Sequence, residues 1–101
     1  MGRTIISNDG CFEWDEDKAN ANWKKHGIAF LEVLPVFFDS ARVEFCDETH
    51  SNEEDRYITI GNAIRNDIML VVVCSTERCG RVRLISARLA SKREEGVYYG
   101  R

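Results

Sequence analysis

The residues whose types could do chemistry are mostly cations in or beside predicted strands. They are Arg56, Arg78, Arg81, Arg83 and Arg88, together with Lys18, Lys25 and His26 on a predicted helix. An arginine in a strand is costly to bury and needs a carboxylate or a phosphate as its partner. The sequence contains no G-x-S-x-G, P-loop or H-E-x-x-H motif, so the usual signals of serine hydrolases, nucleotide triphosphatases and zinc proteases are missing.

Cleavage of RNA needs little more than such a set of cations. The 2′-hydroxyl nucleophile is already in the substrate, so the protein must supply a base, a cation for the charge on phosphorus and an acid for the leaving 5′-oxygen. His26 or Lys25 could act as the base. Arg83 or Arg88 could bind the pentacoordinate phosphate with two hydrogen bonds. We therefore expect phosphate chemistry that requires neither a metal ion nor another cofactor.

The same residues also have simpler structural interpretations. His26 is favourable as a cation at a helix end, and Lys18 and Lys25 could form a solvated stripe. Arg83 could be an outward residue of an edge strand. In an ideal strand Arg83 and Arg88 point to opposite faces, so they meet only if the strand bends or Arg88 lies past its end.

The first half of the chain predicts a short strand at 11–14 followed by two helices. Residues 15–28 begin with acidic residues and end with three basic residues before Gly27, which matches both ends of a helix dipole. Residues 30–38 repeat apolar residues at helical spacing, and Pro35 predicts a kink or a 3₁₀ segment there.

The second half changes from helical periodicity to the alternation typical of strands. Strands are predicted at 41–47, 56–62, 68–76 and 81–87, and an S-x-x-E capping box at 91–94 opens a short C-terminal helix. These elements predict a small α+β single domain over 1–101, with residues 1–10 flexible. Its mainly antiparallel sheet of four to five strands packs against two N-terminal helices and the short C-terminal helix.

Composition excludes several classes of protein. The chain has 101 residues, of which 44% are hydrophobic, which excludes a disordered chain. Its longest apolar run, 68–74, is far shorter than the roughly 20 residues that cross a bilayer, so no membrane association is expected. The start lacks the pattern of a signal peptide, which predicts a cytoplasmic protein with its four cysteines reduced. Without a C-x-x-C pair, a zinc site is not expected.

Charge is distributed unevenly along the chain. Residues 1–55 hold 5 Lys and Arg against 13 Asp and Glu, a net charge of −8, whereas residues 56–101 hold 9 against 4, a net charge of +5. The whole chain has a net charge of −3. A folded domain could therefore carry one cationic surface on an acidic body, as expected of a local phosphate site.

Five blocks of sequence, in order, form a specific pattern. They read FEWDEDKANANWKKHGI, VFFDS, EDRYITIG, VVVCSTER and RVRLISARLASKREEGVYY. Together they resemble the BrnT family of toxins from bacterial type II toxin–antitoxin pairs. The resemblance implies a RelE-like fold and metal-independent RNA cleavage that arrests translation. It also implies a BrnA-like ribbon-helix-helix antitoxin that neutralises the toxin and mediates operator DNA binding, in a hetero-oligomer with two toxin copies.

Positions that match the family pattern narrow the candidate site. The catalytic candidates are Lys25, His26, Arg56, Arg83 and Arg88, and the candidates for binding RNA phosphate are Lys18, Arg78 and Arg81. Asn22, Glu54, Ser86 and Tyr98 match without an assigned role, while Asp15 and Glu94 are better explained as helix-capping residues. The acidic net charge is unusual for ribonuclease toxins of this superfamily, so a second function stays open. It is an inactive BrnT-like interaction module that only binds its antitoxin and acts as an operon co-repressor.

Overall fold

A six-stranded sheet forms the centre of the structure, which is a computed structural model describing residues 2–50, 54–63 and 69–100. The strands are β1 (Thr4–Ile6), β2 (Phe12–Asp15), β3 (Val43–Cys46), β4 (Arg56–Asn62), β5 (Leu70–Arg78) and β6 (Arg81–Leu89). Their order in space is β1-β2-β6-β5-β4-β3. Among the described residues, only β2 and β6 pair in parallel, and the other neighbours are antiparallel. The predicted α+β class and mainly antiparallel sheet are confirmed.

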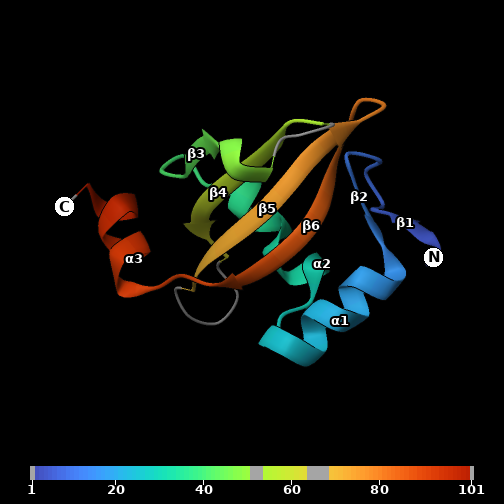
Figure 1. Cartoon of the computed structure of the whole chain (residues 1–101), viewed down its shortest axis with the longest axis horizontal. Helices are drawn as coiled ribbons and strands as arrows, with labels where there is room; N and C mark the ends of the chain where they lie inside the picture. The colour runs from blue at the N-terminus through green and yellow to red at the C-terminus, as the bar shows by residue number, and fades with distance from the viewer. Residues whose placement is uncertain (1, 51–53, 64–68, 101) are drawn as a thin grey trace.

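In the part of the chain that the structure describes, three α-helices and two 3₁₀ segments accompany this sheet. They are α1 (Glu16–His26), α2 (Phe30–Val33), η1 (Leu34–Phe38), η2 (Glu48–His50) and α3 (Lys92–Tyr99). Figure 1 shows α2 and η1 behind the long β5–β6 hairpin, with α3 on the side of the sheet away from β1 and β2. Pro35 lies in the first turn of η1, where its missing N–H costs nothing, so the predicted 3₁₀ segment is confirmed. None of the helices among the described residues is long and apolar enough to cross a membrane.

Helix α1 has the two ends that the sequence predicts. The side chain of Asp15 accepts a hydrogen bond from the backbone N–H of Lys18 at 3.0 Å. At the other end, Gly27 adopts a left-handed conformation with φ of 68°, and its N–H donates to the carbonyl of Trp23. A side chain at that φ would be strained, so glycine is well suited to end the helix there.

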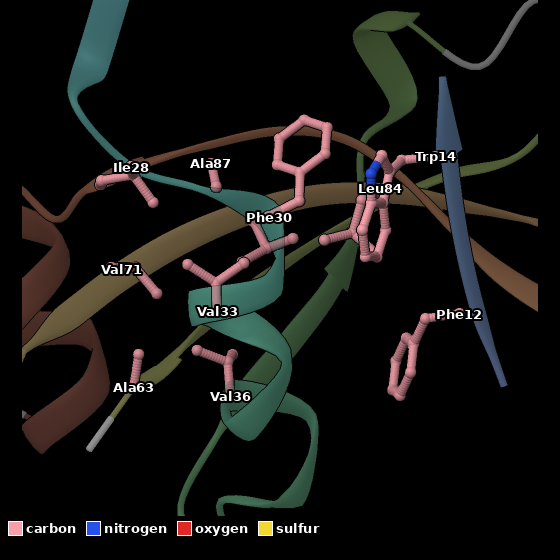
Figure 2. Packing of buried hydrophobic residues seen from close by; sticks show 11 residues of the cluster. Phe12, Trp14, Ile28, Phe30, Val33, Val36, Ala63, Val71, Leu84 and Ala87 are labelled. Carbon is pink, nitrogen blue, oxygen red and sulfur yellow. The ribbon is translucent and has the colours of Figure 1, made fainter. Parts of the chain in front are cut away.

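The hydrophobic core lies on one face of the sheet, beneath α2 and η1. Phe30, Val33 and Val36 from these two segments pack in one cluster with strand residues such as Val71 and Leu84 (Figure 2). We call this face of the sheet the core face. The opposite face, which carries Arg56 and Ile58 of β4, is called the open face.

The sheet has six strands instead of the predicted four to five. The additional strand is Thr4–Ile6, which pairs antiparallel with β2 inside the segment 1–10 that was expected to be flexible. The prediction missed it because a three-residue strand is too short to show a periodic pattern. The predicted strand 68–76 begins at Ile68, which lies outside the described residues.

Candidate functional site

A β-bulge in β6 determines which of its side chains reach the open face. Cys74 pairs with Ser86 but Ser75 pairs with Leu84, so Ile85 is an extra residue in β6. A bulge reverses the alternation of side chains. As a result Arg83 and Arg88 both belong to the open face, which an ideal strand would not allow.

Two adjoining hollows lie on this open face. The first has a volume of about 290 Å³ and is lined by Asp47, Arg56, Ile58, Val72, Cys74, Ile85, Ser86 and Arg88. The second has a volume of about 300 Å³ and is lined by Lys18, Ala21, Asn22, Lys25, His26, Ile85 and Ser86. Because both share Ile85 and Ser86, we treat them as one groove, which runs from α1 across β6 to β4.

The side chain of Asn22 fixes α1 against β6 and so joins the two halves of this groove. Its amide donates to the carbonyls of Ile28 at 3.0 Å and Ala87 at 2.9 Å, and its carbonyl accepts the N–H of Ala87 at 3.0 Å. The pairing of β2 with β6 ends at Leu84, so the amide of Asn22 takes the place of a neighbouring strand at Ala87. Asn22 is only 6% exposed.

The eight predicted site residues can all carry a positive charge. Four of them lie in the parts of the groove formed by α1 and β4. Lys18 and Lys25 are exposed on α1, whereas His26 and Arg56 are half-buried. Burial, followed by the charge of Asp47, raises the pKa of the Cys74 thiol, and the charges of Arg56 and Lys18 oppose this shift. The thiol is therefore held neutral, and positive charge from both halves of the groove reaches it.

Arg88, the fifth candidate in the groove, is held by α3. Its two terminal nitrogens each donate to one oxygen of Glu94 at 2.7 Å, while Glu94 also closes the capping box with Ser91. The hydrogen bond from Arg88 is the largest cause that lowers the pKa of Glu94 to about 2. The same bond raises the pKa of Arg88, so this pair stays ionised at neutral pH.

Replacing Glu94 with glutamine is expected to lower the free energy of unfolding by about 1 kcal/mol at pH 7, after allowance for the solvent exposure of Arg88. The pKa of Glu94 is lower in the folded state, so this stabilisation is present above its ordinary value of 4.5 and is lost as the pH falls through about 2. Urea unfolding at several pH values measures it. If the difference in the free energy of unfolding between wild type and E94Q grows as the pH falls towards 2, the ion pair of Glu94 with Arg88 does not provide this stabilisation.

A second polar contact holds α3 near its C-terminal end. The hydroxyl of Tyr98 donates to Asp39 at 2.7 Å, which raises the pKa of Tyr98 to about 12. Burial alone would raise the pKa of Asp39, but hydrogen bonds from Tyr98, Ala41 and Asn62 together keep it below its ordinary value. Tyr98 thus positions α3, and with it the Glu94 partner of Arg88.

The other three predicted site residues lie outside the groove. Arg83 forms an ion pair with Glu13, whose side chain is only 8% exposed, and Arg81 approaches the same carboxylate at 3.8 Å. Arg78 pairs with Glu54 at 3.1 Å on the surface. In the register of β5, Arg83 and Arg88 lie opposite Thr76 and Val72, which corresponds to about 13 Å along the strand.

Comparison with known families places the groove within a region that matches one family model. Residues 14–94 match the family described as "Ribonuclease toxin, BrnT, of type II toxin-antitoxin system". The chain belongs to the BrnT family. Membership implies an antitoxin partner, and the matched span contains every residue of the groove. No match was found among curated proteins.

The structure gives Arg83 of this BrnT chain a strong structural contact. Replacing Arg83 with alanine removes the partner of a buried carboxylate, so we expect the free energy of unfolding to fall by about 2 kcal/mol, with Arg81 limiting the loss. Urea unfolding measures this change. Arg3→Ala is the matched control because its ion pair with Glu16 is exposed, and it should change stability by less than about 0.5 kcal/mol. Equal losses in both variants would contradict a structural role for Arg83.

Sequence reasoning missed several residues that line the groove. Ser86 is common to both hollows, and Cys74 and Ile58 lie beside it in the register of the sheet. The match of Ser86 and Asn22 to the BrnT pattern was the available signal. Asp47, which also lines the groove, carried no signal because it ends a predicted strand at the start of an acidic stretch.

Proposed function

We propose that this BrnT chain is an endoribonuclease that cleaves RNA in the groove without a metal ion. The observation that supports it best is that side chains able to accept or donate a proton line the same groove as an arginine. Lys25 and His26 of α1 and Arg56 of β4 line two hollows that share Ser86. This set contains the base, acid and phosphate ligand that the chemistry requires.

In the proposed reaction, one group of the Lys25 and His26 pair accepts the proton of the 2′-hydroxyl. The 2′-oxygen then forms a bond to phosphorus, and the bond from phosphorus to the 5′-oxygen breaks. The products are a 2′,3′-cyclic phosphate and a 5′-hydroxyl, which takes its proton from the second group of the pair. Arg56 and Arg88 bind the phosphate oxygens as charge builds up on them, and Lys18 binds a neighbouring phosphate. Arg78 and Arg81 remain candidates for contacts with RNA outside the groove.

Cleavage of messenger RNA by such a site would arrest translation, so the cell needs a tight inhibitor. We propose that the antitoxin is a BrnA-like ribbon-helix-helix protein. Proteins of that type are dimers, which gives a hetero-oligomer with two toxin copies that binds operator DNA only through the antitoxin.

Cleavage of end-labelled RNA by the purified protein in excess EDTA tests the proposal. Wild type should cut, Lys25→Ala should lose most activity, and Lys24→Ala should retain it. Lys24 and Lys25 are neighbours in the last turn of α1 and both are exposed, but of the two only Lys25 lines the groove. Equal activity of the two variants would contradict the site, and cleavage that EDTA abolishes would contradict metal independence. A folded wild type that does not cut free RNA would favour the inactive interaction module.

A further inference from the structure

A third hollow opens on the core face of the sheet, opposite the groove. Its walls include Phe37 of η1, Tyr57 of β4 and Val82 of β6, and Glu44 and Glu77 lie among its lining residues. Tyr57 and Thr59, which also line it, alternate along β4 with Arg56 and Ile58 of the groove. Alternating residues of a strand point to opposite faces. The hollow is therefore a separate site that RNA in the groove does not reach.

The size of this hollow suits a single side chain. Its volume is about 140 Å³, whereas the two hollows of the groove have volumes of about 290 and 300 Å³. Sites for drug-sized ligands are usually about 300–1,000 Å³. The hollow is thus below the usual size of a small-molecule site and large enough for the end of one long side chain.

The chemistry of the lining favours a cation with an apolar stem. The negative charge of Asp55, and to a smaller degree burial and the charge of Glu77, raise the pKa of Tyr57, so carboxylates dominate the electrostatics at this ring. Glu44 already pairs with Arg42 at 3.0 Å, whereas no ion pair of Glu77 occurs among the described residues. An aromatic ring packs against the aliphatic stem of an arginine or lysine side chain, and a neighbouring carboxylate binds its charged end.

Two hydroxyl groups in the lining can form hydrogen bonds with an entering side chain. Thr59 is 1% exposed and Ser75 is 4% exposed, and both line the hollow. Within the part of the chain that the structure describes, neither side chain forms a hydrogen bond. A donor that enters the hollow can hydrogen-bond to these two oxygens, because a hydroxyl accepts as well as donates.

A neighbouring exposed ring indicates that the occupant is part of a protein. Phe38 follows Phe37 in η1 and is 72% exposed, with its ring in edge-to-face contact with Phe12 at 6.1 Å between centroids. Exposed aromatic residues next to a small pocket are typical of the centres of protein interfaces. The BrnT family implies one protein partner in particular, the antitoxin.

We propose that this hollow receives one arginine or lysine side chain of the antitoxin, which thereby holds the toxin from the face opposite the groove. The inference rests on family membership and on the lining of the hollow, and it does not require the proposed RNA cleavage.

The first test uses N-acetyl-arginine amide as a probe, with its neutral analogue N-acetyl-citrulline amide as the control. We expect the arginine probe to cause saturable NMR shifts at the amides of Tyr57, Thr59 and Ser75, and the citrulline probe to cause none. Glu77→Gln should weaken binding of the arginine probe at least threefold. Glu48→Gln, an exposed glutamate outside the hollow, should leave it unchanged. Absence of saturable shifts at these amides would overturn the proposal.

The second test identifies the source of the side chain. We expect Glu77→Gln and Glu77→Lys to weaken binding of the cognate antitoxin at least tenfold by calorimetry, while RNA cleavage by the free toxin stays as in wild type. Unchanged affinity for the antitoxin would overturn the assignment. So would sedimentation showing that Glu77→Lys dissociates a dimer of the toxin itself, because the occupant would then be a second copy of this chain.

Discussion

Replacing Arg56 with alanine is expected to lower the rate of RNA cleavage by about 100-fold or more. Arg56 reaches the groove from β4, across from the α1 residues Lys25 and His26. Removing one preorganised group that stabilises developing charge usually costs about 10² to 10³ in rate. Single-turnover cleavage of a labelled RNA measures the loss directly, because product release does not limit that rate.

Two further variants show whether Arg56 acts on phosphate. Arg56→Lys keeps the charge but not the two-pronged geometry, so we expect it to recover only part of the rate. Arg42→Ala serves as the matched control, since Arg42 is a surface arginine paired with Glu44 and lies outside the groove. Full activity of Arg56→Ala, or an equal loss in Arg42→Ala, would remove Arg56 from the catalytic set.

Replacing Asn22 with leucine should lower the free energy of unfolding by about 3–4 kcal/mol. The substitution leaves the N–H and carbonyl of Ala87 and the carbonyl of Ile28 buried without the hydrogen bonds that Asn22 now provides. Each buried group left unsatisfied costs about 1–3 kcal/mol, and the apolar side chain recovers part of that cost. Urea unfolding followed by circular dichroism gives the change.

Asn20→Leu is the control for helix propensity and added hydrophobicity. Asn20 is exposed on the same helix, so its replacement should change stability by less than about 0.5 kcal/mol. If the two leucine variants unfold at the same urea concentration, the contact between Asn22 and Ala87 does not hold α1 in place. A folded fraction of Asn22→Leu should also cleave RNA poorly, because the α1 residues would no longer lie at a fixed distance from Arg56.

Local features of this protein could be predicted from the sequence. The acidic start and the glycine end of α1, the 3₁₀ segment at Pro35 and the capping box of α3 all depend on residues within a few positions of one another. Such signals are visible in a single stretch of chain. The blocks of sequence that resemble the BrnT family were also sufficient to predict the family, which the match over residues 14–94 confirms.

The composition of the groove, in contrast, was decided by the tertiary structure. Arg83 and Arg88 share a face only because Ile85 is an extra residue in β6, and the pairing of β6 with β5 creates that bulge. Arg83 is held by a carboxylate 70 residues away, and Asn22 fixes a backbone segment 65 residues away. The sequence by itself determined the elements and the inventory of cations. Only long-range pairing could assign each cation to the groove or to a structural ion pair, because both roles require the same residue type and differ only in the partner that folding brings to it.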